Sequence, residues 1–174
     1  MRTSRAQGSL IAVLSDTHGY LDPAIPALFE GAAHIIHAGD ILAPEIVEEL
    51  SKVAPVTAVA GNLDRGELAE TLPKEVVAEA GGVVFAVGHK RKRLLKRLAE
   101  GRVEGMGDGG PPRLVVYGHE HVPAVAWVDG ALHLNPGTAS APEEEDEVAT
   151  VAFVDVLPSG LSVTFVPLAA RQHR

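Results

Sequence analysis

Short apolar runs alternate with amphipathic stretches along the first third of the chain. Residues 10–14 (LIAVL), 34–38 (HIIHA) and 56–60 (VTAVA) have the length and the apolar content of buried strands. Residues 23–31 and 44–52, which lie between them, have the spacing and the Pro and Gly punctuation of short helices. The alternation predicts βαβ units, which build a parallel sheet.

The pattern changes after Pro73. Two apolar runs separated by Gly81-Gly82 predict a β-hairpin over residues 74–89, and residues 90–101 can form a helix whose leucines face inward. Further strands are expected over residues 113–121, 122–128, 131–135, 147–156 and 161–168, the last four as a terminal meander. Together these elements predict an α/β sandwich that is parallel early and antiparallel late.

The length of 174 residues corresponds to one domain, expected over 1–174 with loose tails at 1–9 and 169–174. Residues 105–112, rich in glycine, and 141–147, rich in charge, are predicted loops. No apolar run approaches the roughly 18 to 20 residues of a membrane span, and the first nine residues lack the apolar stretch of a signal peptide. We therefore expect a cytoplasmic protein without a membrane partner.

The composition narrows the chemistry. The chain has no cysteine, which excludes disulfide scaffolds, thiolate zinc sites and cysteine nucleophiles, so any metal must be held by His, Asp, Glu or Asn. A net charge of −8 argues against a protein that coats nucleic acid through a general basic surface. The 46% of hydrophobic residues against 22% charged residues is enough to build a packed core.

Ligand-type side chains follow five of the predicted strands, at the point where each strand ends. The set comprises Asp16 and His18, Asp40, Asn62, His89, and His119 with His121. Because the carboxyl ends of parallel strands meet at one edge of a sheet, we expect these side chains to lie together. Gly39, Gly61 and Gly118 precede three of them, as a tight turn or a close backbone approach requires. His119 and His121 are expected on one face of a strand, since they alternate.

Two carboxylates, one amide and four imidazoles are more ligands than one small ion needs, and they suit two divalent ions that share a ligand. The mixture of Asp and His fits Mn²⁺, which we expect first, and also Ni²⁺, Fe²⁺, Zn²⁺ or Co²⁺, but not the all-oxygen shells of Mg²⁺ or Ca²⁺. Two such ions would hold a bridging hydroxide as nucleophile and clamp the oxygens of a phosphoryl group. The pattern therefore predicts hydrolysis of phosphoesters.

Each motif also has a purely structural interpretation when it stands alone. Gly-Asp and Gly-Asn are ordinary turn dipeptides, and Asp-x-His is frequent by chance. The ordered set of five, each after a strand, is what indicates a site. His37 and His133 lie inside predicted strands, where a hydrogen-bonded structural role is expected, and no Ser-His-Asp arrangement surrounds Ser15.

Read in order, these residues resemble the calcineurin-like metallophosphoesterase superfamily, over residues 10–166. The short chain, with residues 61–64 (GNLD) and 135–138 (NPGT), is most similar to the compact YfcE-type phosphodiesterase branch. The resemblance implies a four-layer α/β/β/α sandwich of two mixed sheets. It also implies two metal sites that share Asp40 as a bridge: Asp16, His18, Asp40 and His121 at the first metal, and Asn62, His89 and His119 at the second.

Two positions depart from the family pattern. Many members have a His after the Asn that acts on the leaving group, whereas this chain has Leu63, so a side-chain general acid is absent there. The fifth block usually reads His-Gly, whereas here it reads His89-Lys90-Arg91. An alternative register would place Val87 at the ligand position and leave the second metal underligated.

Residues 90–97 hold six of the 15 basic residues of the chain. This basic run could grip a phosphate beside the metals, or it could be the solvated face of a helix whose leucines pack inward. The candidate substrate contacts are Asp64, Arg65, Lys90 and Arg91.

The protein is predicted to be a metal-dependent phosphoesterase, with phosphodiesterase activity favoured. Its predicted catalytic residues are Asp40, Asn62 and His119. The expected substrate is a small phosphodiester or phosphomonoester, and nucleic acid only as a small nucleotide. The alternative is a catalytically weak metal-binding scaffold for protein interactions, as in the retromer subunit of the same superfamily. A homo-oligomer that pairs through the late strands is left open.

Overall fold

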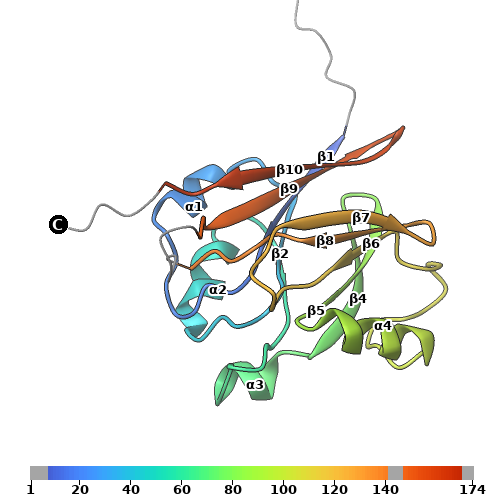
Figure 1. Cartoon of the computed structure of the whole chain (residues 1–174), viewed down its shortest axis with the longest axis horizontal. Coiled ribbons are helices and arrows are strands. Elements are labelled where there is room, and N and C mark those ends of the chain that lie inside the picture. The colour runs from blue at the N-terminus through green and yellow to red at the C-terminus, as the bar shows by residue number, and fades with distance from the viewer. Residues whose placement is uncertain (1–7, 141–146, 170–174) are drawn as a thin grey trace, which may run out of the picture.

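Ten strands form two five-stranded sheets in the computed structural model, which describes residues 8–140 and 147–169 (Figure 1). The first sheet has the order β10-β9-β1-β2-β3 and contains β1 (Ser9–Leu14), β2 (His34–His37), β3 (Val56–Ala58), β9 (Thr150–Leu157) and β10 (Gly160–Pro167). The second has the order β4-β5-β6-β8-β7 and contains β4 (Glu75–Ala80), β5 (Val83–Gly88), β6 (Leu114–Val116), β7 (Ala124–Val128) and β8 (Ala131–Asn135).

Four helices connect these strands within the described residues: α1 (Ala24–Leu28), α2 (Pro44–Ser51), α3 (Glu67–Thr71) and α4 (Arg91–Ala99). The predicted βαβ units are confirmed, because β1, β2 and β3 are parallel and α1 and α2 cross between them. The predicted hairpin is confirmed as β4 and β5. No helix of the described chain has the length and apolar character needed to cross a membrane.

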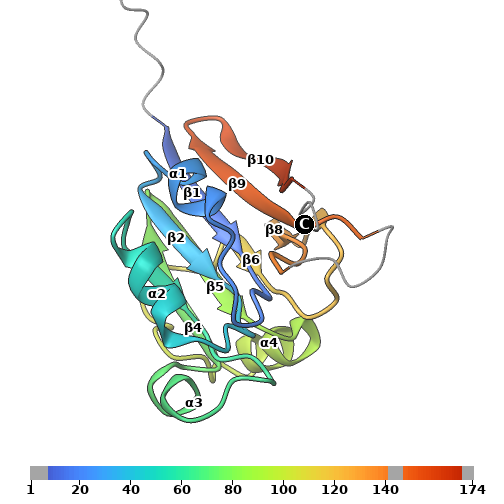
Figure 2. The same cartoon turned by 90° about the vertical axis from the view of Figure 1, so that its left-hand side faces the viewer.

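The alternation of side chains along β1 supplies residues to both sides of the first sheet. Ala12 and Leu14 face α1 and α2, where they share a buried cluster with Phe29 and Leu50. Figure 2 looks onto this side, with α1 and α2 in front of the strands. The two helices thus cover the outer face of the first sheet.

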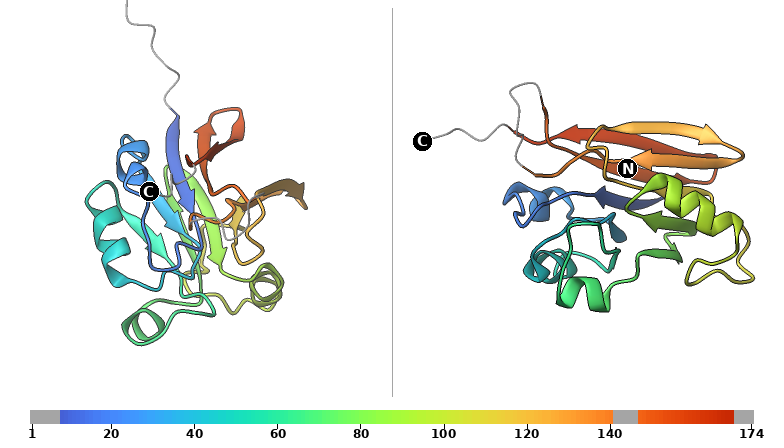
Figure 3. Two further views of the ribbon diagram at one scale, coloured as in Figure 1. Left: turned by 60° about the vertical axis from the view of Figure 1, so that its left-hand side comes forward. Right: turned by 60° about the horizontal axis from the view of Figure 1, so that its bottom comes forward.

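The inner face of the first sheet packs on the second sheet. Ile11 and Val13 of β1 lie in one buried cluster with Phe85 of β5 and Leu134 of β8. A third cluster, around Leu94 of α4, covers the outer face of the second sheet. Figure 3 shows α1 and α2 on one side of the sheets and α4 on the other. The protein is therefore an α/β/β/α sandwich of two mixed sheets, as predicted.

The prediction that the last four strands form a terminal meander is wrong. β7 and β8 belong to the second sheet, where β8 is parallel to β6, whereas β9 and β10 form a hairpin beside β1 in the first sheet. Hydrophobic alternation identifies a strand but not its partner, so the change of sheet between β8 and β9 left no signal in the sequence.

Other boundaries differ from those predicted. β6 ends at Val116, so the following residues are not in a strand, and the five-residue helix α3 was not predicted. β1 begins at Ser9, inside the segment expected to be a tail. Residues 1–7 and 170–174 of the predicted tails, and residues 141–146 of a predicted loop, lie outside the described residues.

Candidate metal centre

The predicted ligands lie in the loops that follow five strands, at the carboxyl ends of those strands. Asp16, Asp40 and Asn62 follow β1, β2 and β3 of the first sheet, while His89 and His119 follow β5 and β6 of the second. In Figure 2 the arrowheads of β1, β2 and β5 point to the same lower edge, beside α4. The candidate centre is therefore assembled from both sheets at their common end.

The backbone of these loops is held in an uncommon conformation. Five of the predicted ligands have positive φ: Asp16 (56°), His18 (48°), Asp40 (53°), His119 (73°) and His121 (59°). Among the other non-glycine residues of the described chain, only Leu42 and Asp129 share this property. Such conformations concentrate at functional sites, where the surroundings hold them in place.

Cross-loop hydrogen bonds fix this backbone. The N–H groups of Asp16, His18 and Gly19 donate to the carbonyl oxygens of residues 39–41, at 3.0, 3.1 and 2.8 Å. The expectation that His119 and His121 alternate on a strand is wrong, because β6 has already ended and both residues are in left-handed turns. The turns nevertheless bring the His121 ring within 5.1 Å of the His18 ring and the His119 ring within 5.2 Å of the His89 ring, between centroids.

A buried group of three ligand atoms comes from Asp16, Asp40 and His89. The Nε2 atom of His89 lies 3.2 Å from Asp40 Oδ2 and 3.9 Å from Asp16 Oδ1. On the other side of the ring, Nδ1–H donates to the carbonyl oxygen of Ala38 at 2.8 Å. Such a bond to the backbone fixes the ring and leaves Nε2 to face a metal ion, as in protein metal sites generally. We call these three residues the buried group.

A second group, which we call the open group, comes from Asp16, His18 and His121. Asp16 Oδ1 lies 3.0 Å from His121 Nε2 and 3.6 Å from His18 Nε2. The His18 and His121 side chains are 20% and 34% exposed, whereas that of Asp16 is fully buried. Asp16 is thus common to both groups, and Asp40 Oδ2, 3.8 Å from His18 Nε2, also lies between them.

Asn62 and His119 lie at the exposed rim of the centre. Both are exposed, and His119 does not belong to the two groups of closely spaced His and Asp ligand atoms. Asn62 lines a cavity together with His89, and His119 stacks edge-on against the His89 ring. The structure therefore brings both residues beside His89, on the solvent side of it.

The fit of a cation is indicated by polar atoms that lack partners. Nε2 of His18 and Nε2 of His89 are buried and make no hydrogen bond with the described residues. Two buried carboxylates, Asp16 and Asp40, lie within 4 Å of them. Buried unpartnered nitrogens and concentrated carboxylates are costly unless an ion binds them. The donor set of imidazole and carboxylate fits a divalent transition metal.

The electrostatics of the buried group favour charged side chains. Burial acts to raise the pKa of Asp40, but the neighbouring His89 imidazole and the N–H of Leu63, which donates to Asp40 Oδ1 at 2.8 Å, hold that pKa below its usual value. For His89, burial acts to lower the pKa, but Asp40 and Asp16 outweigh it and the pKa is raised. A carboxylate that stays ionised is a ready ligand for a cation.

Residues outside the predicted ligand set position Asp16. The Ser15 hydroxyl donates to Asp16 Oδ2 at 2.5 Å, and the Thr138 hydroxyl donates to the Asp16 carbonyl oxygen at 3.0 Å. A Cβ on Gly118 would lie 2.1 Å from Ser15 Oγ and 2.6 Å from Asp16 Oδ2, so glycine is required for close approach. Ser15 is therefore a positioning residue and not a nucleophile.

His37 and His133 have the structural roles expected of them. His37 is fully buried, with Nε2 3.1 Å from the Thr17 hydroxyl and Nδ1 accepting from the Gly39 N–H. Nδ1 of His133 lies 3.2 Å from an Nη atom of Arg91.

The four candidate substrate residues fall into two classes. Arg65 and Lys90 are exposed and line the cavity beside Asn62. Asp64 borders the same cavity, but it is buried and its carboxylate accepts three backbone N–H bonds, from residues 41, 42 and 61. Arg91 instead lies over the Tyr117 ring, 5.7 Å from its centroid, and beside His133.

Comparison with known proteins identifies the family. Residues 10–158 match the model of the calcineurin-like phosphoesterase superfamily domain. The chain belongs to this superfamily. A probable metallophosphoesterase of Methanothermobacter thermautotrophicus is 31% identical over 151 residues, which cover 84% of this chain and 86% of that protein. The superfamily fold is built around divalent metal ions, in agreement with the donor set described above.

Two solved structures with a similar fold have different functional descriptions. An archaeal phosphodiesterase has a TM-score of 0.67 at 22% identity, covering 91% of this chain and 99% of its own. Vps29 of Entamoeba histolytica in complex with Zn²⁺ has a TM-score of 0.64 at 18% identity, covering 91% and 98%. At these identities the likeness shows the fold alone.

Proposed function

We propose that this protein is a phosphodiesterase that uses two divalent metal ions, Mn²⁺ foremost, with a hydroxide that bridges them. The observation that carries the proposal is the pair of ligand groups that share Asp16 and surround the unpartnered Nε2 atoms of His18 and His89. When bound, the ions supply the nucleophile and neutralise charge on the phosphoryl oxygens.

The residues divide the work by their position. Asp16, His18 and His121 would hold the first ion, His89 would hold the second with Asn62 and His119, and Asp40 would serve both. The exposure of Asn62 and His119 beside His89 supports a role for both in holding the ion to which the phosphoryl group would bind.

Leu63 sets the preference for diesters with good leaving groups. Its backbone N–H is fixed on Asp40 Oδ1, while its side chain is 46% exposed and offers no proton. A leaving group must therefore depart as the anion, which favours groups of low pKa. Arg65 and Lys90 are the proposed contacts to the rest of the substrate. Asp64 is better suited to holding the loop.

The test is hydrolysis of bis-p-nitrophenyl phosphate by metal-stripped protein, before and after addition of Mn²⁺ or Ni²⁺. Metal should restore activity, and Asp40→Asn should lower it by at least about 1,000-fold, since the carboxylate proposed to bridge the two ions is lost. Near-normal turnover by Asp40→Asn would contradict the mechanism and point to a contaminating enzyme.

The second candidate function is a metal-binding interaction scaffold. The fold likeness to Vps29 and the missing general acid at Leu63 favour it. Metal binding by calorimetry without hydrolysis under any metal would make it the leading function. Self-association through β7, an edge strand that exposes Val125 and Trp127, stays a prediction for sedimentation analysis.

A further inference from the structure

A cavity of about 390 Å³ opens directly beside the candidate metal centre. Asn62 and His89 form one wall, so the cavity continues from the proposed second metal site. The other walls come from the loop after β3, the start of β4 and the first turn of α4. A substrate held at the metal centre would therefore extend one of its substituents into this space.

The cavity is lined by four basic side chains: Arg65, Lys74, Lys90 and Arg93. Arg93 forms an ion pair with Glu75, and the carboxylate of Asp64 is taken up by backbone N–H groups. In the part of the chain that the structure describes, no acidic side chain pairs with Arg65, Lys74 or Lys90. Three cations unpaired with a carboxylate thus line this cavity, although the whole chain carries a net charge of −8. One Nη atom of Arg65 donates to the carbonyl oxygens of Asn62 and Asp64.

The start of α4 adds to this positive charge. Lys90 is the N-cap, residues 91–93 are all basic, and the first turn has neither an acidic residue nor a side-chain cap. A helix N-terminus carries partial positive charge, so cations there oppose the helix dipole. Helix stability alone favours Ser, Asp or Glu at these positions. An anion in the cavity would offset the repulsion.

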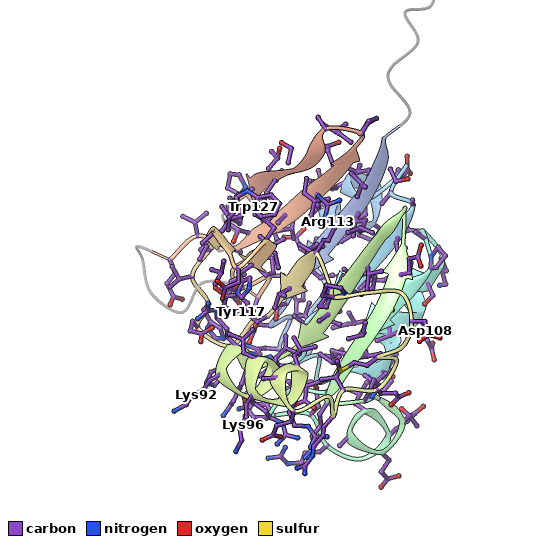
Figure 4. The ribbon with its side chains drawn as sticks, turned by 90° about the vertical axis from the view of Figure 1, so that its right-hand side faces the viewer. Lys92, Lys96, Asp108, Arg113, Tyr117 and Trp127 are labelled. Carbon is purple, nitrogen blue, oxygen red and sulfur yellow. The ribbon has the colours of Figure 1, made fainter. Side chains whose placement is uncertain are left out.

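The side chains of the basic run, residues 90–97, lie on different sides of α4. Lys90 and Arg93 line the cavity, whereas Arg91 faces Tyr117. Figure 4 shows Lys92 and Lys96 extending away from α4 at the outside of the molecule. Only Lys90 and Arg93 of this run are therefore candidates for phosphate binding in the cavity, and Lys92 provides a control on the same helix.

We propose that this cavity binds a second phosphate group of the substrate, remote from the phosphodiester that is cleaved. The substrate class is then a phosphodiester with one arm that ends in a phosphate. A dianionic phosphate matches the three unpaired cations. The inference rests on the proposed phosphodiesterase function for the reacting group and adds the specificity of the neighbouring site.

Two nucleotide esters that differ by one phosphate provide the test. The p-nitrophenyl ester of thymidine 5′-phosphate has an uncharged nucleoside arm, and the same ester of thymidine 3′,5′-bisphosphate adds a phosphate to that arm. With the metal-loaded protein, kcat/KM should be at least about tenfold higher for the second ester, mainly through KM. The preference should shrink when salt rises from about 50 to about 500 mM.

The variants assign the preference to the cavity. Lys74→Gln and Lys90→Gln should each bring the ratio of the two kcat/KM values toward one. Lys92→Gln, which removes the same charge from the outer side of α4, should keep the wild-type ratio. Equal kcat/KM for the two esters in the wild type, or an equal loss of preference in Lys92→Gln, would overturn the inference.

A binding measurement separates this inference from the proposed function. Calorimetry compares thymidine 3′,5′-bisphosphate with thymidine 5′-monophosphate on the metal-loaded protein, without turnover. Tighter binding of the bisphosphate that Lys90→Gln abolishes supports the cavity site, even where no ester is hydrolysed and the phosphodiesterase proposal fails. Equal binding of the two nucleotides overturns the cavity site, even where bis-p-nitrophenyl phosphate is hydrolysed.

Discussion

The buried group and the open group share Asp16 but are held in different ways. The side chains of Asp40 and His89 are 3% and 4% exposed, and each is fixed by a bond to the backbone, from Leu63 and to Ala38. His18 and His121 are several times more exposed. Folding alone therefore fixes the buried half, whereas the open half keeps contact with solvent, through which ions and substrate arrive.

The largest expected difference between the two halves is in metal binding. His89→Gln should abolish binding of one of two Mn²⁺ ions, because the His89 side chain is only 4% exposed and solvent does not readily take its place. His121→Gln should retain both ions and weaken one by roughly 10–100-fold, since solvent can occupy the vacated position. Titration calorimetry measures both. Equal losses in the two variants would show that burial does not distinguish the groups.

The pH dependence of the free energy of unfolding reports on the buried side chain of His37. Burial lowers the pKa of His37 to about 3 from 6.5. Below pH 6.5 the His37 imidazole is protonated in the unfolded chain but stays neutral in the native protein. The contribution of His37 to the free energy of unfolding is therefore fully present above pH 6.5 and is lost as the pH falls toward 3. The loss is about 1.4 kcal/mol per pH unit, or about 2 kcal/mol at pH 5.

The contribution of His37 is isolated by comparison with His37→Gln in urea unfolding of the metal-free protein. The variant cannot gain the proton, so the stability difference between wild type and variant should shrink by about 2 kcal/mol from pH 7.5 to pH 5. A difference that stays constant with pH would show that His37 is not held neutral.

Close packing under the shared ligand gives a smaller effect. Gly118→Ala places a methyl group against Ser15 Oγ and Asp16 Oδ2, and should lower the free energy of unfolding by about 1–3 kcal/mol and weaken metal binding. Gly107→Ala is the control, because a Cβ there meets no atom within 4 Å. Similar effects of the two substitutions on denaturant midpoints would contradict this account.

The smallest expected effect is a gain at the exposed rim. Leu63→His places an imidazole where the backbone is already fixed on Asp40, so a proton donor reaches the leaving group. Hydrolysis of p-nitrophenyl phosphate relative to the diester should rise by a few-fold, up to roughly tenfold. An unchanged ratio would show that the leaving group departs on another side.

The convergence of the candidate ligands was predictable from sequence because they follow apolar strands. That signal brought residues 16, 40 and 89 together correctly. The expected alternation of His119 and His121 failed because left-handed turns leave no period in the sequence. Arg93 was included only as part of the basic run of residues 90–97, and Lys74 was not predicted at all, since the cavity that both line joins β4 to α4 and nothing local marks such a contact. The supporting role of Thr138 is similarly invisible, because 122 residues separate it from Asp16.

The candidate ligands come from both sheets, so the centre links the two halves of the sandwich. Asp16, Asp40 and Asn62 come from one sheet and His89, His119 and His121 from the other. An ion bound by both sheets would act as a reversible cross-link, and its binding free energy would add to the stability of the folded chain. Thermal denaturation should therefore report metal occupancy directly: each tenfold rise in free metal above its dissociation constant adds about 1.4 kcal/mol per site.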